Sequence, residues 1–474
     1  MDRKTMAELE NSKGFVKSLE ALVEVLVLTA VYAPVWCWYC GRYLASHYGN
    51  RYFPVLLYGV LTAVVQGHGE GFSFGNLRRF SLCVAQWISL AVVNGITWIQ
   101  ISLMANTPVP VLPLILLTAV QAVPVLGFVY LYSALYYRLY APHTMIMVFG
   151  HEEAVGLKFK MDTRRDKYKI KKMISTDLGL ERVCREIVGY DCVLINDVPA
   201  RIRNDILKFC YRNRIRTYIV PKISDILMRG AADINVLDTP IVMVKGTGLS
   251  LVDRVAKRGL DLVLCLIALA LTFPVMLAVA AAIRLEDGGP VFFRQKRATI
   301  GGKEFEILKF RSMIVDAEKD GISIPATGDD PRITRVGRFI RATRIDELPQ
   351  ILNILKGDMS VVGPRPERLE HMTEYSGEIP EFEYRLKVKG GLTGYAQIYG
   401  KYNTSPYDKL RLDLMYIENY SLLLDLKLIL LTLRILFSKE STEGFEKVEE
   451  LEAMKKEALA QVAEEAGRKP EKEE

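Results

Sequence analysis

Residues 260–283 read LDLVLCLIALALTFPVMLAVAAAI, and this apolar run decides how the chain is organised. The run is long enough to cross a bilayer, which takes about 20 residues in a helix. Pro274 follows Phe273 near its middle. A proline inside a helix removes a hydrogen bond and bends the axis. The run therefore either crosses the membrane with a kink or enters it, bends and returns to the same side.

The basic residues around this run favour the second arrangement. The stretch that follows, from Arg294 to Arg344, is crowded with lysine and arginine, and such stretches tend to stay on the cytoplasmic side. Lys257, Arg258 and Arg284 flank the run, where their charges would meet lipid headgroups. We predict a re-entrant membrane helix over about 259–284, broken at Pro274, with both neighbouring domains in one compartment.

Composition limits the kinds of partner. A chain of 474 residues has room for two or three domains, and its net charge of +7 is modest. No block of basic residues interleaved with aromatic residues is present, so we expect no nucleic acid partner. Membrane lipids and phosphorylated substrates suit this charge. The seven scattered cysteines resemble neither a disulfide framework nor a zinc site, and they indicate a reducing compartment.

The amino-terminal part contains apolar segments with basic residues at their ends. Residues 1–140 are predicted to form a four-helix transmembrane region, with lysine and arginine on the inner side before the first segment and between the second and third. This orientation places the chain after Arg138 in the cytoplasm, as part of a multi-pass protein of the inner, cytoplasmic membrane. The four segments are residues 16–40, 52–66, 80–104 and 111–135.

Residues 141–248 show short apolar runs that alternate with amphipathic stretches. This alternation predicts a parallel, Rossmann-like α/β domain. Its first turn, from Gly150 to Gly156, has few glycines for a dinucleotide site. A structural or dimer-forming role is favoured, with nucleotide binding left open, and we expect a homodimer. The predicted strands are 144–149, 191–195, 216–220 and 241–244, and the predicted helices are 177–188 and 199–214.

The rest of the chain divides into a mixed α/β region and a tail. Residues 249–438 are predicted to form a mixed α/β domain that ends in an amphipathic stretch, 416–437, able to lie on the membrane. Residues 439–474 are rich in Glu, Lys and Ala and are predicted to form a solvated helix that frays into a tail.

The densest chemical signal lies between Phe305 and Pro366, where two adjacent carboxylates, Asp346 and Glu347, stand among cations. Nearby positive charge lowers the pKa of a carboxyl group, so the pair is expected to be ionised beside a bound diphosphate. Pro349 predicts that the pair lies at or just before a helix amino terminus. The neighbouring cations are Lys309, Arg311, Arg335, Arg338, Arg341, Arg344 and Arg365.

Two readings of the pair remain open from the residues alone. Asp346 could attack phosphorus to form an acyl phosphate while Glu347 holds Mg²⁺. Alternatively, Asp346 caps the helix and Glu347 pairs with Arg344 or Arg341.

The order of motifs resembles the polyprenyl-phosphate hexose-1-phosphate transferases, a family of bacterial sugar transferases. The similarity covers about 253–437, and the four apolar segments and the Rossmann-like domain resemble the larger members. The motifs are Lys257, Arg258 and Asp261; Phe293, Gln295 and Arg297; residues 309–313, 334–338, 346–350, 353–366 and 391–397; Asp413, Tyr416 and Ile417; and residues 424–427.

The resemblance implies a monotopic phosphoglycosyl transferase domain that works in two steps. Asp346 would attack the sugar-linked phosphate of a UDP-sugar and expel UMP, and a polyprenyl phosphate would then take the sugar phosphate from Asp346. Glu347 matches the Mg²⁺-binding residue, and Arg365 and Arg341 match phosphate-binding residues. Which sugar is transferred stays open.

Further positions follow from the same resemblance. Lys309 and Arg311 are candidates either for phosphate binding or for anchoring the domain to headgroups. Asp413 matches a polar position that supports the site, with a surface helix residue as the alternative. Pro364, Pro366 and Gln397 complete the predicted substrate-binding set.

The sequence departs from the family pattern at Thr299, Gly390 and Arg344, which concerns loop shape and donor fit. Two rival functions remain: a non-catalytic membrane scaffold that senses a nucleotide, and a membrane-attached NAD-dependent nucleotide-sugar dehydratase. The intact Asp346–Glu347 pair with Arg365 argues against the first, and the glycine-poor turn after Phe149 argues against the second.

Overall fold

The computed structural model describes residues 3–44, 52–75, 77, 79–140, 142–150, 156–162, 167–244, 246–315, 330–400 and 404–436. These residues form two compact units that meet in the sequence at Val220 and Pro221. The predicted turn at 151–155 and the predicted tail at 439–474 lie outside the described residues.

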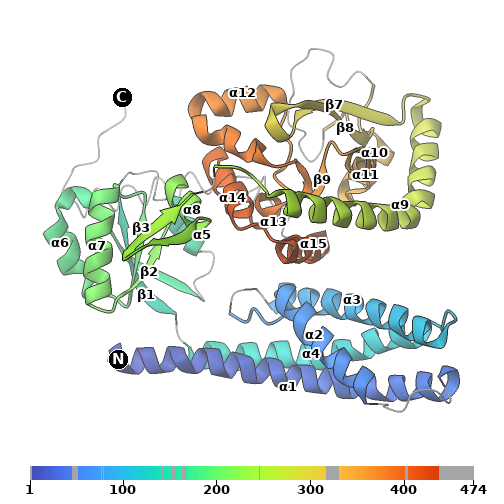
Figure 1. The fold of residues 1–474 in the computed structure, drawn as a ribbon, viewed down its shortest axis with the longest axis horizontal. Helices are drawn as coiled ribbons and strands as arrows, with labels where there is room; N and C mark the ends of the chain where they lie inside the picture. Colours follow the sequence, from blue (N-terminus) through green and yellow to red (C-terminus); the bar gives the residue numbers. More distant parts are fainter. Residues whose placement is uncertain are drawn as a thin grey trace. The chain divides into compact units, whose positions relative to one another are not determined.

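The first unit begins with the predicted apolar helices. Their length and composition are those of a membrane protein. Helices α1, α3 and α4 are each long and apolar enough to cross a bilayer, whereas α2 has 16 residues and is short for a span. The bundle is packed from inside by aromatic side chains, with the rings of Tyr32 and Tyr58 stacked 3.9 Å apart. The helices are α1 (Arg3–Tyr43), α2 (Phe53–His68), α3 (Arg79–Ala105) and α4 (Leu112–Leu139) (Figure 1).

A parallel four-stranded sheet follows, in the order β2-β1-β3-β4, as the alternating pattern predicts. Helices α6 and α7 pack on one face of the sheet and α5 on the other. β2 was not predicted because lysines interrupt its apolar pattern. The elements are β1 (His143–Phe149), α5 (Gly156–Asp162), β2 (Tyr168–Ser175), η2 (Thr176–Leu178), α6 (Leu180–Ile187), β3 (Cys192–Asn196), α7 (Ala200–Arg212) and β4 (Arg216–Ile219).

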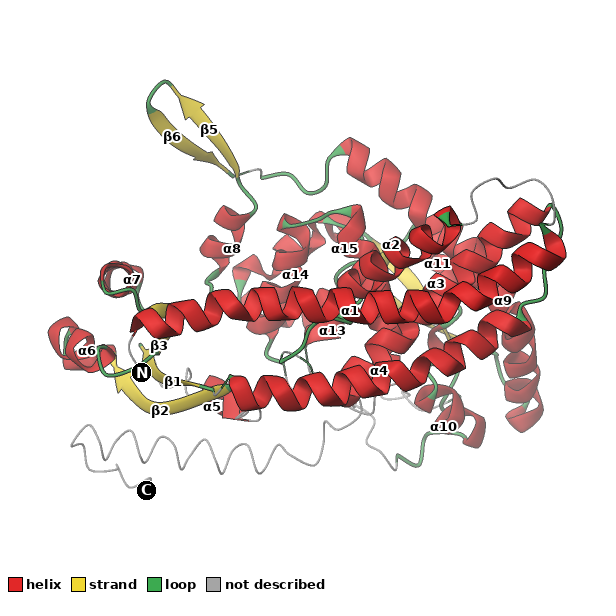
Figure 2. Ribbon diagram, turned by 90° about the horizontal axis from the view of Figure 1, so that it is seen from below, coloured by secondary structure: helices red, strands yellow, loops and turns green. Residues whose placement is uncertain are grey.

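The predicted strand at 241–244 does not join this sheet, which corrects the expectation for 141–248. It forms β6 (Thr239–Met243) and pairs antiparallel with β5 (Ala232–Val236), as a separate hairpin that Figure 2 shows extending away from α8 (Ile223–Arg229). The chain leaves the parallel sheet after β4 because α8 buries Ile223 and Ile226 in the core of the second unit.

The second unit contains α9 (Leu251–Asp287), a single helix of 37 residues with Pro274 inside it. Figure 1 shows α9 as two arms that meet at a bend. The helix extends beyond the predicted range of 259–284 at both ends. The Ser250 side chain caps its start, and Gly288 in a left-handed conformation ends it.

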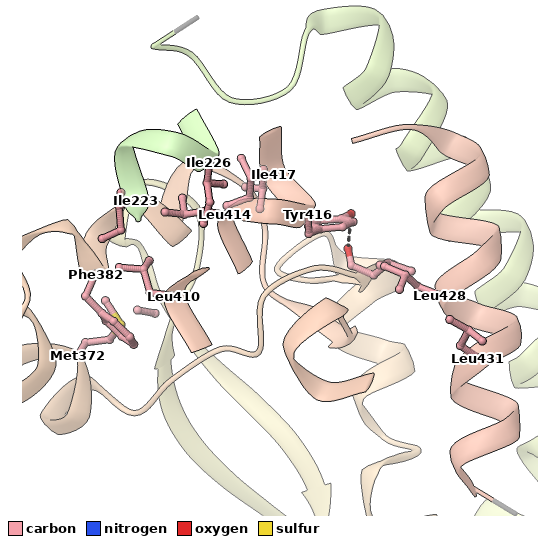
Figure 3. Packing of buried hydrophobic residues seen from close by; sticks show 13 residues of the cluster. Ile223, Ile226, Met372, Phe382, Leu410, Leu414, Tyr416, Ile417, Leu428 and Leu431 are labelled. Atoms are coloured by element: carbon pink, nitrogen blue, oxygen red, sulfur yellow. Dashed lines mark hydrogen bonds between the residues drawn. The ribbon is translucent and has the colours of Figure 1, made fainter. Parts of the chain in front are cut away.

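The remaining elements pack around more than one core. Helices α8, α12, α14 and α15 share the core drawn in Figure 3, whereas β8, α10 and α11 pack against α9 in two further clusters. The predicted amphipathic stretch at 416–437 is broken after Glu418, because α14 ends there and α15 begins at Leu422. Leu428 and Leu431 of α15 are buried in this core, while Leu423 is exposed. The elements are β7 (Phe292–Ala298), η3 (Ile300–Gly302), β8 (Glu304–Phe310), α10 (Arg335–Ala342), η4 (Ile345–Glu347), α11 (Gln350–Lys356), β9 (Ser360–Val362), α12 (Leu369–Glu378), η5 (Pro380–Lys387), β10 (Gly391–Thr393), α13 (Tyr395–Tyr399), α14 (Pro406–Glu418) and α15 (Leu422–Leu436).

Candidate active site

The two adjacent carboxylates lie on the short turn η4, between α10 and α11. Arg344 before the turn has a left-handed backbone conformation (φ 58°), which turns the chain sharply out of α10. Pro349 stands immediately before α11, where its missing N–H costs nothing. The position predicted for Asp346 and Glu347, just before a helix amino terminus, is therefore confirmed.

Glu347 is the centre of a charged cluster. Its Oε1 accepts a hydrogen bond from Nζ of Lys309 at 2.7 Å and one from Nη2 of Arg365 at 3.1 Å. Lys309 comes from β8, and Arg365 follows β9, so three separate segments meet here. Burial alone would raise the pKa of Glu347, but Arg365 and Lys309 outweigh it and hold the pKa well below the ordinary glutamate value. Glu347 is thus fixed as a carboxylate, paired with Lys309 and Arg365 and with neither Arg344 nor Arg341.

Asp346 has a different environment from its neighbour. It makes no hydrogen bond or ion pair with any residue that the structure describes, so its carboxyl group is not a helix cap. Burial raises the pKa of Asp346, which outweighs the opposing effects of Lys309 and Arg341. The expectation that surrounding cations lower the pKa of both carboxyls is wrong for Asp346, because it is desolvated without a direct cationic partner.

A small polar pocket adjoins this cluster. Lys309 and Arg365 reach it from the Glu347 side, and Arg297 adds a third cation. The Arg297 guanidinium donates to the Pro366 carbonyl at 3.2 Å and to Gln295 Oε1 at 2.6 Å. The pocket has the charge that a diphosphate requires. Its lining residues are Arg297, Ile307, Lys309, Gln350, Arg365, Pro366 and Gly391.

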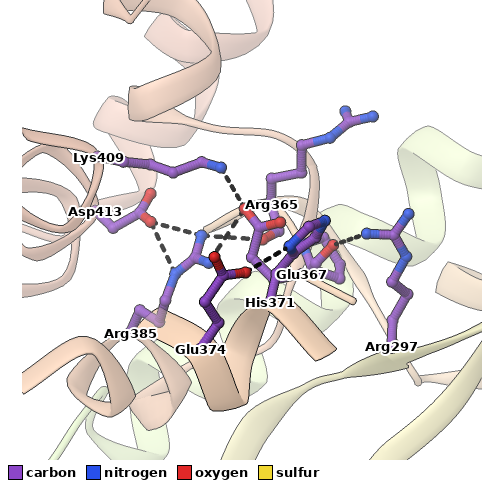
Figure 4. A network of polar contacts seen from close by, with 9 residues as sticks. Arg297, Arg365, Glu367, His371, Glu374, Arg385, Lys409 and Asp413 are labelled. Atoms are coloured by element: carbon purple, nitrogen blue, oxygen red, sulfur yellow. Dashed lines mark hydrogen bonds and ion pairs between the residues drawn. The ribbon is translucent and has the colours of Figure 1, made fainter. Parts of the chain in front are cut away.

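A second ionic network contacts the backbone of Arg365 (Figure 4). Nη2 of Arg385 donates to the Arg365 carbonyl at 3.0 Å and to Oδ2 of Asp413 at 2.7 Å. Lys409 and Arg385 both pair with Glu367. Asp413 is 1% exposed, so it is not a surface residue. Sequence reasoning missed Arg385 and Glu367, because nothing in their local pattern indicates which backbone or carboxylate they contact.

Other predicted residues have other partners. Arg311 pairs with Asp287 at the end of α9. Gln397 donates from Nε2 to the Leu392 carbonyl at 2.9 Å, and the Pro364 carbonyl accepts the Gly391 N–H. Arg341 lies on α10 and contributes only an electrostatic effect at Asp346.

Both arms of α9 hold the segment that carries the carboxylates. Arg258 donates to the carbonyls of Ile354 and Leu355, at 2.6 and 2.7 Å, and so caps the carboxyl end of α11. At the other end of α9, Oε1 of Glu286 accepts the N–H of Arg335 at 2.8 Å, at the start of α10. The turn that carries Asp346 and Glu347 thus lies between two helices that α9 contacts.

Asp261 of α9 contacts β9, which follows α11 in the chain. Its Oδ1 accepts from Ser360 Oγ at 3.0 Å and from the Val361 N–H at 2.9 Å. Lys257 pairs with Asp425 of α15 at 2.6 Å. Lys257, Arg258 and Asp261, in the first three turns of α9, therefore contact other parts of the protein.

Comparison with known proteins gives a consistent picture. Residues 252–439 match the family described as "Bacterial sugar transferase". The chain is 44% identical over 185 residues to a UDP-N-acetylgalactosamine-undecaprenyl-phosphate N-acetylgalactosaminephosphotransferase of Aeromonas hydrophila, covering 38% of this chain and 44% of that protein. It is 44% identical over 198 residues to a UDP-glucose:undecaprenyl-phosphate glucose-1-phosphate transferase of Escherichia coli, covering 41% of this chain and 42% of that protein.

A shorter relative is covered more fully. A UDP-glucose:undecaprenyl-phosphate glucose-1-phosphate transferase of Caulobacter vibrioides is 44% identical over 190 residues, which cover 39% of this chain and 71% of that protein. The chain spans less than half the length of the first two relatives. The three aligned stretches, of 185, 198 and 190 residues, are close in length to the region 252–439 that matches the family.

Proposed function

Because this chain belongs to the bacterial sugar transferase family, we propose that it transfers a sugar 1-phosphate from a UDP-sugar to undecaprenyl phosphate and releases UMP. The reaction would initiate the assembly of a surface polysaccharide. The observation that carries the proposal is the pairing of Glu347 with Lys309 and Arg365 beside Asp346, within the region that matches the family.

We propose Asp346 as the nucleophile. Its carboxylate oxygen would attack the phosphorus that bears the sugar, and the bond from this phosphorus to the bridging oxygen would break as UMP leaves. An oxygen of undecaprenyl phosphate would then attack the same phosphorus and return Asp346 to a carboxylate. Lys309, Arg365 and Arg297 surround the adjoining pocket and would stabilise the phosphate charge in both steps. The raised pKa of Asp346 suits a nucleophile, because a more basic carboxylate has a stronger affinity for phosphorus.

The residues present fit a Mg²⁺ ion at Glu347. Oε1 is occupied by Lys309 and Arg365, while Oε2 has no hydrogen-bond partner within the described chain. Mg²⁺ usually binds one or two carboxylates and completes its shell with water and substrate phosphates. When bound, the ion would neutralise charge on the transferred phosphate.

The membrane arrangement follows from the bend in α9. We propose that α9 is re-entrant, with both ends on the cytoplasmic face, and that the catalytic domain is monotopic and contacts headgroups there. The parallel sheet is proposed to be Rossmann-like. The domain limits 1–140, 141–248, 249–438 and 439–474 stay predictions apart from the reassigned 221–244, and homodimer formation stays a prediction.

The direct test uses the purified full chain in detergent or nanodiscs with undecaprenyl phosphate, Mg²⁺ and a panel of UDP-sugars. The panel would contain glucose, galactose and their N-acetylated forms. We expect one of these donors to give UMP together with a lipid-linked sugar diphosphate. A change in nicotinamide absorbance without UMP would instead favour a dehydratase, and the absence of both products would favour a scaffold.

The nucleophile is tested by Asp346→Asn, which preserves shape and removes the attacking oxygen charge. We expect loss of transfer and loss of the phosphosugar adduct that is trapped on the wild-type protein when the acceptor is omitted. Asp358→Asn is a matched control, because Asp358 pairs with Lys356 outside the Glu347 cluster. Full activity in Asp346→Asn would remove Asp346 from the mechanism.

A further inference from the structure

The interior of the amino-terminal bundle holds two carboxyl groups that the transfer reaction does not use. Glu20 and Glu24 lie one turn apart on α1, and Glu24 is fully buried. Nε2 of Gln86 on α3 donates to Oε2 of Glu24 at 3.2 Å and to the Gly71 carbonyl at 2.9 Å. Within the described chain, neither carboxyl group forms an ion pair. Ionisable side chains in such a position are rare in membrane helices and usually functional.

Most of the oxygen atoms in this cluster have no partner. Both carboxyl oxygens of Glu20, Oε1 of Glu24 and Oε1 of Gln86 are buried without a hydrogen bond to any described residue. Gln66 of α2 is also fully buried, and neither polar atom of its amide has a hydrogen-bond partner among the described residues. A Cβ atom at Gly71 would lie 3.2 Å from Gln66 Oε1, so Gln66 and Gln86 approach the same glycine.

The neighbouring ionisable groups do not neutralise the cluster. Lys17, one turn before Glu20 on α1, has its Nζ 5.5 Å from the centre of the Tyr136 ring on α4. Tyr132 of α4 is within electrostatic reach of Glu20, and its buried hydroxyl has no hydrogen-bond partner in the part of the chain that the structure describes. Cys83 of α3 is within electrostatic reach of Glu24, is buried, and carries no positive charge. Unpaired oxygen acceptors therefore outnumber unpaired donors.

A second buried polar cluster in the same bundle has its hydrogen-bonding groups paired. Tyr58 donates to Oδ1 of Asn94 at 2.8 Å, Asn94 donates to Oε1 of Gln121 at 3.1 Å, and Gln121 donates to the Tyr58 oxygen at 2.9 Å. These three side chains satisfy one another. The Glu20–Glu24 cluster differs because it has acidic groups and too few donors.

We infer that Glu20, Glu24, Gln66 and Gln86 form a binding site for a small cation, either a proton or a monovalent metal ion, inside the bundle. An unpaired carboxylate is strongly disfavoured in a medium of low dielectric constant. A proton shared by the two carboxyl groups removes the charge. A metal ion would instead use the carboxylate and amide oxygens as ligands, which are the oxygen donors that hard cations prefer.

The test uses the full chain in lipid nanodiscs, with Na⁺ as the metal probe and choline to keep ionic strength constant. Two measurements are made on wild type: the melting temperature as Na⁺ replaces choline, and the infrared band of protonated carboxyl groups at neutral pH. A rise in melting temperature with Na⁺ would identify a metal ion. A protonated carboxyl band that is lost in Glu20→Gln or Glu24→Gln would identify a proton.

The control is Thr62→Val, another isosteric change at a fully buried polar residue of the bundle, whose hydroxyl donates to the Tyr58 carbonyl. This variant should keep the wild-type response. If one glutamine variant does not fold, the other still assigns the carboxyl band to this cluster, and the Na⁺ dependence of wild-type melting needs no variant. Melting that is independent of Na⁺, together with no protonated carboxyl band at neutral pH, overturns the inference. UMP release is a separate readout, so failure of the transferase proposal is distinguishable.

Discussion

Asp346 and Glu347 are adjacent in the chain, yet their carboxyl groups have pKa values shifted in opposite directions. Glu347 receives two direct charged hydrogen bonds, from Lys309 and Arg365, and these overcome the effect of burial. Asp346 is also partly buried but receives none. One turn of chain thus supplies a carboxylate that is ionised at neutral pH and a more basic one, which are the two properties that charge stabilisation and nucleophilic attack require.

The first prediction concerns the pH dependence of transfer. Asp346 must be ionised to attack, and its pKa is above the ordinary aspartate value, so kcat should begin to fall at a higher pH than for an unperturbed aspartate as the solution is acidified. Arg341 lowers this pKa, so Arg341→Gln should move the acid limb of the profile to still higher pH. Arg338→Gln, an exposed change on the same helix, should leave it in place. An acid limb that does not respond to Arg341→Gln would contradict the assignment of this limb to Asp346.

The second prediction concerns the stability that Glu347 provides. Glu347→Gln leaves two partly buried cations without their counter-charge, so we expect the protein to lose about 1–3 kcal/mol of stability near neutral pH. Because the folded pKa of Glu347 is lowered, this contribution is complete above the unfolded value of about 4.3 and disappears as the pH falls toward the folded value. The difference in melting temperature between wild type and Glu347→Gln should therefore shrink on acidification. A difference that is constant with pH would show that charge is not its source.

The third prediction concerns Asp413, which acts through Arg385 on the backbone of Arg365. Asp413→Asn should release Arg385 and shift Arg365, and a misplacement of about 1 Å can cost about 100-fold in rate. We expect a fall in kcat of about 10- to 100-fold, measured by UMP release, in protein that is still folded. Asp408→Asn on the same helix removes a more exposed carboxylate that pairs with Arg411 one turn away, and it should have little effect. Equal losses in the two variants would contradict a positioning role for Asp413.

The fourth prediction concerns the contact of α9 with α11. Arg258→Ala removes both donors to the last carbonyls of α11 and should loosen the turn that carries Asp346. We expect kcat to fall about 10-fold, while binding of UDP, measured by calorimetry, changes less. Arg254→Ala, an exposed residue one turn earlier, provides the control. A loss of UDP affinity with unchanged kcat would argue for a direct substrate contact instead.

The fifth prediction concerns the topology of α9. Val255 and Leu285 lie near its two ends and are 65% and 86% exposed. In a protein without other cysteines, Val255→Cys and Leu285→Cys should both react with an impermeant thiol reagent only from the cytoplasmic side. Thr107→Cys, in the loop between α3 and α4, should react only from the outer side. Labelling of the two α9 positions on opposite faces would exclude the re-entrant arrangement.

The sequence alone indicates the elements whose signal is local. Apolar runs of sufficient length predict α1, α3, α4 and α9 because a bilayer demands about 20 apolar residues. Pro349 locates the Asp346–Glu347 turn, since proline is favoured in the first turn of a helix. The strand at β2 escaped detection because its lysines hide the apolar alternation.

Tertiary structure alone decided which long side chains meet. Lys309 and Arg311 are two residues apart on the same segment, yet Lys309 pairs with Glu347 and Arg311 with Asp287. Likewise, residues 239–243 have strand character, but the burial of α8 in the second unit determines that they pair with β5 rather than with the parallel sheet. Local patterns fix backbone conformation through steric and solvent effects, whereas ion pairs and strand partners depend on groups that only folding brings within a few ångströms.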